Sequence, residues 1–168
     1  FPNSNEGIGP TGMHSVNFSS GGGPTDGALV DNNGSKYTVW PHLWAEWRTM
    51  GFENWSGPAT RDSFTTPDGQ GQAVWFGGCS AIYWAPGTGA HSIHGAICDK
   101  WSALGYEGGF GYPATDESGT PDGFGRFNHF SKSGDTVEPS TGSTGSIYWT
   151  SATGAWSVHG LIHWEWAH

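Results

Sequence analysis

The stretch TPDGQGQAVWFGGCSAIYWAPGTGA, residues 66–90, carries the clearest signal of the fold we expect for this chain. Its first four residues indicate a turn, because Pro67 fixes φ and the following Asp-Gly pair tolerates the left-handed region. Residues 72–76 alternate like a strand, and after a Gly-Gly break residues 81–84 read as the return strand of a hairpin. A second turn at residues 86–89 precedes an apolar segment with helical spacing. The stretch therefore predicts a β-hairpin followed by a helix.

The same pattern occurs three times along the sequence. A second Thr-Pro-Asp-Gly turn at residues 120–123 precedes strand-like residues 125–130 and 146–149. The Ser/Thr/Gly-rich insertion from Ser131 to Gly145 is expected to form a mobile loop. A period of this size indicates small units that bury their hydrophobic faces against one another. The units are residues 1–56, which are degenerate, 57–111 and 112–168.

Apolar residues recur at matched positions of the predicted helices, and we expect them to form the core. The aligned sets are Val39, Ile93 and Val158; Leu43, Ile97 and Ile162; and Trp47, Trp101 and Trp166. The first two of these helices are expected to end at Gly51 and Gly105. The predicted fold class is α+β, with three β-hairpin-plus-helix repeats in a closed pseudo-threefold arrangement in which the termini meet. Residues 1–168 are predicted to form a single domain.

The composition excludes several kinds of partner. The formal net charge is −9, which disfavours nucleic acid because nucleic-acid binding requires clustered Lys and Arg. No apolar run approaches the ~20 residues of a membrane span, so no membrane insertion is expected. The 11 Trp, 9 Phe and 5 Tyr argue against disorder. The chain starts with Phe1 instead of Met, and we interpret it as a processed, secreted protein.

Cys79 and Cys98 are the only cysteines of the chain. Cys79 leads into a predicted strand and Cys98 lies on the following predicted helix, so a disulfide closing a short loop is favoured. Two buried free thiols remain the alternative.

Segments of the second and third units resemble a known family. The segments are GYEGGFGYPATDE at 105–117, DGFGR at 122–126, SIYW at 146–149 and TGAH at 88–91. They are similar to the LGFP repeat, and the resemblance covers about residues 67–168. LGFP-repeat proteins attach to actinobacterial cell envelopes, often beside hydrolase or mycolyltransferase domains, and related stretches occur in secreted fungal proteins. The resemblance implies an attachment module for an envelope or a polysaccharide. Since the repeats stand alone here, it points to a free-standing glycan-binding protein.

Sugar binding requires an aromatic face and planar polar side chains, and matched positions of the units offer both. Aromatic or His residues that replace one another between units are the candidates, because core positions would keep an apolar identity. The candidate aromatic and His residues are Trp84 and Trp149, which align; His91 and Trp156, which align with Tyr37; His94 and His159, which align with Trp40; and Trp75 and His129, which align. The alternative for these positions is packing with a polar tip.

Asp116, Glu117 and Arg126 form the best polar cluster of the third unit. The second unit has Arg61-Asp62 and Gln72 in the same places. These side chains are candidates for contacting a sugar, or they have a structural role, with a carboxylate capping the Pro-Asp-Gly turn and pairing with Arg126.

The sequence supports a catalytic function less than it supports sugar binding. Asp116 and Glu117 are adjacent and should diverge on an extended segment, whereas a glycoside hydrolase needs two acids facing a cleft. No Gly-x-Ser-x-Gly elbow occurs. His91 and His94 form only an incomplete metal motif, so no metal or other cofactor is expected.

We therefore predict a secreted, non-catalytic, lectin-like protein that binds cell-wall or surface glycans, is multivalent through its repeats, and is a monomer or weak oligomer. The alternatives are a small cell-wall hydrolase and a protein-binding structural or effector module.

Overall fold

The structure is a computed structural model that describes residues 7–8, 12–18, 27–132, 143–160 and 162. The chain divides into two compact units, Phe1–Trp84 and Ala85–His168. The predicted single domain of residues 1–168 stays a prediction.

The first unit contains an antiparallel sheet with the strand order β1-β2-β3-β4. Its strands are β1 (Gly7–Ile8), β2 (His14–Phe18), β3 (Gly27–Asn32) and β4 (Ser35–Val39). Two helices follow, α1 (Pro41–Met50) and α2 (Glu53–Ser56). The strands β5 (Phe64–Thr65), β6 (Gln72–Trp75) and β7 (Ser80–Ala85) come next and pair in sequence, antiparallel. Helix α1 packs against both β3 and β6.

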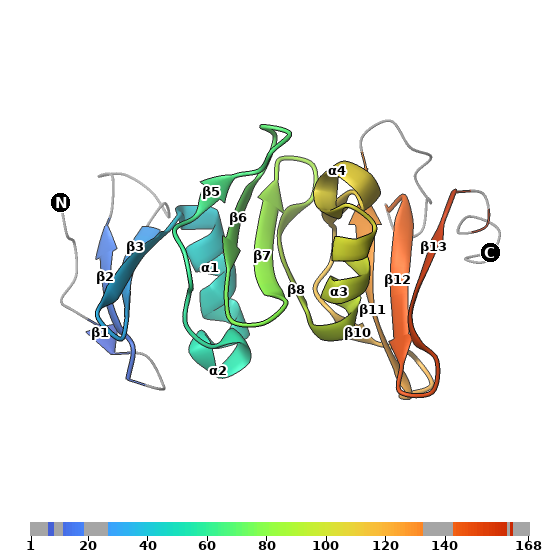
Figure 1. Cartoon of the computed structure of the whole chain (residues 1–168), viewed down its shortest axis with the longest axis horizontal. Helices are drawn as coiled ribbons and strands as arrows, with labels where there is room; N and C mark the ends of the chain where they lie inside the picture. Colours follow the sequence, from blue (N-terminus) through green and yellow to red (C-terminus); the bar gives the residue numbers. More distant parts are fainter. Residues whose placement is uncertain (1–6, 9–11, 19–26, 133–142, 161, 163–168) are drawn as a thin grey trace. The chain divides into compact units, whose positions relative to one another are not determined.

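The remaining elements belong to the second unit. It begins with β8 (Gly89–His94), α3 (Gly95–Ala103) and α4 (Tyr106–Phe110). Its sheet consists of β9 (Tyr112–Pro113), β10 (Ser118–Gly119), β11 (Gly125–Ser131), β12 (Gly145–Thr150) and β13 (Gly154–His159). The strand order is β10-β11-β12-β13, and β9 also pairs with β11. Helix α3 packs against β12 and β13 (Figure 1).

The predicted fold class is wrong. The described residues are mostly β-sheet and form three open antiparallel sheets, not three hairpin-plus-helix repeats in a closed pseudo-threefold arrangement. The main physical reason is that residues 89–94 and 154–159, which we expected at the start of helices, form β8 and β13. Glycine bounds β8, since Gly89 has a φ of 85° and Gly95 a φ of 56°, and helix α3 begins only at Gly95.

The predicted core is correct for the first two repeats. Val39, Leu43 and Trp47, and likewise Ile93, Ile97 and Trp101, are at most 2% exposed. In the third repeat Val158 is half-buried and Ile162 is 75% exposed, so the core prediction is wrong there. Trp166 and residues 133–142 of the predicted loop lie outside the described residues.

The buried helix residues Trp47 and Trp101 also form hydrogen bonds with the segment that follows their helix. The indole Nε1–H of Trp47 donates to Ser56 Oγ at 3.0 Å, and that of Trp101 donates to the carbonyl of Gly111 at 2.9 Å. A buried indole N–H needs such a partner. The acceptors differ, a side-chain hydroxyl in one repeat and a backbone carbonyl in the next, but both lie in the segment that follows the helix.

The predicted turns and helix end are confirmed. Gly69 and Gly123 of the two Thr-Pro-Asp-Gly turns have φ values of 73° and 78°. The carboxylate of Asp68 accepts from the backbone N–H of Gln70 at 3.0 Å, as expected for an Asp in a turn. Helix α1 ends at Gly51, whose φ of 92° is the left-handed conformation that glycine adopts readily.

The predicted disulfide between Cys79 and Cys98 is confirmed, since both cysteines are disulfide-bonded and no free cysteine remains.

Candidate functional site

Asp62 and Asp116 each accept hydrogen bonds from a strand of the preceding repeat, so they are equivalent, and the predicted alignment of Arg61-Asp62 with Asp116-Glu117 was wrong by one residue. The carboxylate oxygen Oδ1 of Asp62 accepts from the backbone N–H of Thr38 at 2.7 Å and from its hydroxyl at 2.9 Å. Oδ1 of Asp116 accepts from the N–H of Ser92 at 2.8 Å and from its hydroxyl at 2.9 Å. The repetition of the whole arrangement indicates that these carboxylates connect neighbouring repeats.

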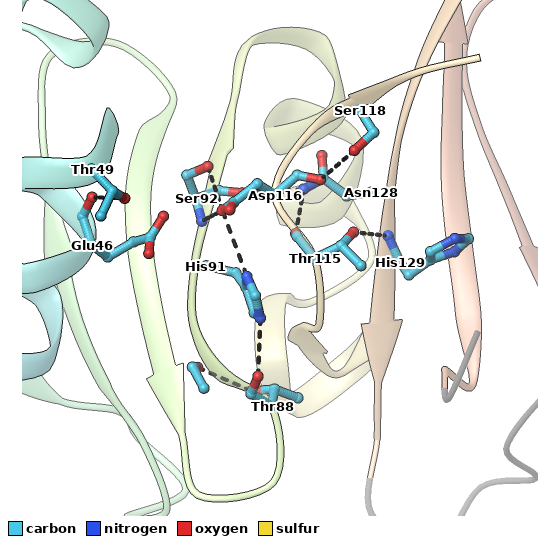
Figure 2. A network of polar contacts seen from close by, with 11 residues as sticks. Glu46, Thr49, Thr88, His91, Ser92, Thr115, Asp116, Ser118, Asn128 and His129 are labelled. Atoms are coloured by element: carbon cyan, nitrogen blue, oxygen red, sulfur yellow. Dashed lines mark hydrogen bonds and ion pairs between the residues drawn. The ribbon is translucent and has the colours of Figure 1, made fainter. Parts of the chain in front are cut away.

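Asp116 is the centre of a larger polar network (Figure 2). His91 Nδ1 lies 3.6 Å from Asp116 Oδ1, and His91 Nε2 lies 2.9 Å from the carbonyl of Thr88, to which it donates. Asn128 donates from Nδ2 to the carbonyls of Ser92 and Thr115 at 3.1 and 2.9 Å. Three of these residues belong to the second repeat and three to the third, so the network holds the two repeats together.

The network determines the charge of Asp116. Burial of this side chain, which is still 41% exposed, acts to raise its pKa. The hydrogen bonds from His91 and Ser92 and the charge of His91 act in the opposite direction and hold the pKa below its usual value. Asp62 likewise has a lowered pKa, because Thr38 donates to it from its backbone N–H and its hydroxyl.

Four other candidate residues are dispersed over the sheets. His129 Nδ1 lies 2.6 Å from Ser146 Oγ, and Trp75 packs edge-to-face on Tyr83 with ring centroids 6.1 Å apart. Trp156 is 64% exposed and donates from Nε1 to the carbonyl of Thr153 at 2.8 Å. His159 packs at a right angle on Phe110, with centroids 5.8 Å apart. These contacts hold each ring in place on its own strand.

The remaining candidates within residues 85–168 come together around one pocket of about 180 Å³. It is lined by His94, Glu117, Arg126 and Trp149, and by Gly95, Ala96 and Ile97 from the first turn of α3. The sequence predicted the first four of these residues individually as site residues, whereas it indicated Ile97 only as core and gave no signal for Gly95 and Ala96.

The secondary structure explains why these side chains meet. Arg126 in β11 and Trp149 in β12 are direct cross-strand partners, so their side chains share one face of the sheet. Glu117 immediately precedes β10, the neighbour of β11. Helix α3 packs against β12, and His94 is its N-cap residue. The pocket therefore lies where the helix of the second repeat meets the sheet of the third.

Glu117 organises the polar side of the pocket. Its side chain is only 10% exposed, and its oxygen Oε1 accepts from Arg126 Nε at 2.7 Å while Oε2 lies 3.3 Å from His94 Nε2. Arg126 Nη2 also donates to the Glu117 carbonyl at 3.3 Å. These contacts fix three planar polar groups beside the indole of Trp149. Arg126 remains 47% exposed and His94 35%, so both can still reach a ligand.

The equivalent tryptophan of the second repeat is covered by a residue that the sequence did not indicate. Trp84 stacks on His42 of α1, with ring centroids 4.5 Å apart and an interplanar angle of 4°. His42 belongs to the degenerate first repeat, where the comparison between units was weakest.

A second pocket, of about 470 Å³, lies in the first unit. It is lined by Gly12, Met13, His14, Asp31, Asn32, Asn33, Gly34 and Pro58. Hydrogen bonds from Lys36 and from the N–H of Gly34 keep the pKa of Asp31 low. Among the described residues that line this pocket there is no Trp, Tyr or Phe, so they offer no indole or phenyl face like that of Trp149.

The described residues contain no group of three or more His, Cys, Asp or Glu that could hold a metal ion. Likewise, no helix within the described ranges is long and apolar enough to cross a membrane.

Comparison with known families agrees with the repeat pattern. The model of the LGFP repeat matches residues 57–109 and 110–168. The chain belongs to the LGFP repeat family. The two LGFP matches begin within two residues of the repeat boundaries predicted at 57 and 112. LGFP repeats are generally cell-wall-associated. The pocket is thus formed by two consecutive LGFP repeats, with its helix from the first and its sheet from the second.

No curated protein matches the sequence. Among solved structures, hydrazine synthase of Kuenenia stuttgartiensis is similar at 13% identity over 92% of this LGFP-repeat chain and 36% of that chain, with a TM-score of 0.19. The chain thus spans about a third of that protein's length, and at such a TM-score the likeness carries no inference.

Proposed function

We propose that this LGFP-repeat chain is a non-catalytic carbohydrate-binding protein that recognises glycans of a cell wall or cell surface. The observation that carries the proposal is the pocket of His94, Glu117, Arg126 and Trp149. Its residue types are those that sugar recognition requires, and the fold brings them together from four separate segments.

The chemistry of the pocket suits one sugar ring. The face of an indole is electron-rich, so it attracts the polarised C–H groups on the flat side of a pyranose. Arg126 has five N–H donors, of which its bonds to Glu117 use two. The carboxylate of Glu117 has lone pairs beyond those facing Arg126 and His94. A pocket of about 180 Å³ is smaller than the ~300–1,000 Å³ of drug-sized sites, which favours a single ring over an enclosed polymer.

The geometry around the acids favours binding over hydrolysis. The adjacent carboxylates have different partners, Ser92 for Asp116, and Arg126 with His94 for Glu117. Glycoside hydrolysis requires two carboxyl groups facing one bond.

The disulfide and the family support an extracellular, wall-associated location. Disulfides persist in oxidising compartments and are rare in the cytosol, and LGFP repeats are associated with cell-envelope proteins. The net charge of −9 argues against nucleic acid as a partner.

Binding of the whole chain to a glycan array, with parallel pull-downs on chitin, glucan and peptidoglycan, tests the proposal. W149A is the test variant, and W156A is a matched control that removes an exposed Trp outside the pocket. The proposal predicts selective binding that free sugar competes away and that W149A loses but W156A keeps. Absence of binding to every glycan and polymer would refute it. Release of soluble fragments from any polymer would show a hydrolase instead.

A protein-binding role is the second candidate, because Phe124 is 81% and Trp156 64% exposed. Large exposed apolar side chains are typical of interaction surfaces when they gather in patches. Cell-surface capture that survives complete deglycosylation and is lost in F124A or W156A would favour this candidate.

A further inference from the structure

Two tryptophans at the same position of consecutive repeats have different surroundings. Trp84 in β7 is the cross-strand partner of Gln72, and Trp149 in β12 is the partner of Arg126. The helix of the preceding repeat lies against each sheet, although on different strands: α1 contacts β6, the neighbour of β7, whereas α3 contacts β12 and β13. The two indoles therefore have the same place in their sheets, and each lies beside the first turn of the preceding helix.

The helix contributes a ring in one place and a methyl group in the other. The second residue of α1 is His42, whose imidazole lies parallel to the indole of Trp84 at 4.5 Å. The second residue of α3 is Ala96, which is exposed and lines the pocket at Trp149. Within the described part of the chain, no aromatic ring contacts Trp149. The space that His42 fills over Trp84 thus corresponds to the open pocket over Trp149.

We propose that His42 is an internal substitute for a ligand: it occupies over Trp84 the place that a neutral pyranose ring takes over Trp149. This inference rests on the proposed carbohydrate-binding function and assigns it to a single stacking site, at the contact of the second and third repeats. The site is open because residue 96 is alanine, and its counterpart is closed because residue 42 is histidine.

The stack at Trp84 indicates what kind of group fits. An interplanar angle of 4° means that the space accepts a flat ring lying parallel to the indole. A pyranose chair presents such a flat side through its axial C–H groups, and a CH-rich face stacks favourably on a π-system.

The polar groups further distinguish the two places. Around Trp149 the charged pair of Glu117 and Arg126 lies at the rim of the pocket, together with His94. The corresponding positions of the preceding repeat are Ser63, Gln72 and Trp40, which form no ion pair. Paired donors and acceptors match vicinal hydroxyl groups, so the ligand class is a neutral sugar with free equatorial hydroxyls.

The test compares A96H with A96S and H42A in the full-length chain. A96H places an imidazole where His42 stands in the preceding repeat, and A96S is its matched control, because it adds a polar atom without a ring. H42A opens the stack at Trp84, far along the chain from the pocket. The probes are tetrasaccharides of β-1,4-linked glucose, β-1,3-linked glucose, β-1,4-linked N-acetylglucosamine and α-linked mannose. Affinity and stoichiometry are measured by calorimetry, and NMR reports the ring-current shift of the introduced imidazole.

The expected result is that A96H binds the preferred tetrasaccharide at least about tenfold more weakly than the wild type, a change of about 1.4 kcal/mol. A96S and H42A should keep the wild-type affinity within about twofold. The introduced imidazole in A96H should show the upfield ring-current shift that His42 shows in the wild type.

Two results would overturn the inference, and they differ. If the wild type binds a sugar and A96H binds it as tightly as A96S does, sugar binding stands but the site over Trp149 is wrong. If neither the wild type nor any variant binds a sugar, the proposed function itself fails. An A96H imidazole without a ring-current shift would show that the two places are not equivalent.

Discussion

Replacing Asp116 by alanine should destabilise the second unit substantially. The change removes a carboxylate that accepts hydrogen bonds from the backbone N–H and the hydroxyl of Ser92, at 2.8 and 2.9 Å. Hydrogen bonds to a charged group contribute about 1.5–3 kcal/mol. Because the Asp116 side chain is 41% exposed, solvent screening places its contribution at the lower end of that range.

The loss of the partner adds a second cost. Ser92 is fully buried, and a buried N–H left without an acceptor costs about 1–3 kcal/mol. We therefore expect D116A to lower the free energy of unfolding by about 2–3 kcal/mol. For a chain of this length that corresponds to a fall in Tm of about 5–10 °C. D116N keeps one acceptor oxygen without the charge, so its loss should be less than half of this.

The pH dependence provides an independent check. The pKa of Asp116 is lower in the folded state than in the unfolded chain, so the ionised carboxylate stabilises the fold at neutral pH. That contribution is complete above the unfolded pKa of about 4 and is lost as the pH falls through the folded pKa. The assay is thermal unfolding by circular dichroism from pH 7 to pH 2. A Tm of D116A within about 1 °C of the wild type at pH 7 would refute this account of how the repeats are joined.

Three further predictions follow from the same structure. D62A should also lower stability at pH 7, and its difference from the wild type should shrink in acid, because the pKa of Asp62 is lowered by Thr38; equal Tm values at pH 7 would contradict this. Reducing the disulfide of Cys79 and Cys98 should lower the free energy of unfolding by about 3 kcal/mol, the loop-closure value for a loop of about 20 residues. Denaturant unfolding with and without reductant measures this change, and an unchanged denaturation midpoint would count against it. W149L should weaken sugar binding at least about tenfold in a calorimetric titration while W84L leaves it within about twofold, and equal losses in both variants would show that the two indoles do not differ.

The sequence predicted the local structure well where a residue's conformational preference decides it. The Pro-Asp-Gly turns and the helix end at Gly51 were predicted because glycine and proline restrict φ directly. The buried positions Leu43 and Trp47 were predicted because a helical period marks one face.

The predicted start of the second helix was wrong because the strand β8 and the helix α3 meet there and their apolar spacings run together. Ile93 and Ile97 are four residues apart, which reads as one helical face, yet Ile93 lies in β8 and Ile97 in α3. An apolar residue at the end of a strand is indistinguishable by spacing from one in the first turn of a helix. The closed arrangement was inferred from the period alone, and a period does not determine whether sheets close.

The candidate site was predictable in residue type but not in pairing. Asp116 and Glu117 are adjacent, and alternation on an extended segment separates them as expected, but only the fold reveals that one binds Ser92 and the other Arg126. Ala96 has no functional group that sequence analysis would single out, and it matters because its small side chain leaves the pocket beside Trp149 open. His42 was missed because its repeat is degenerate, so no aligned residue drew attention to it.

The most direct test of carbohydrate binding at the pocket is a two-dimensional NMR titration of the tryptophan indole N–H signals with the glycan that the array selects. The account predicts that the signal of Trp149 shifts and saturates with one sugar site per chain, together with the Nε–H signal of Arg126, while that of Trp84 stays in place. A saturable shift of Trp156 or Trp84 with Trp149 unchanged would contradict it.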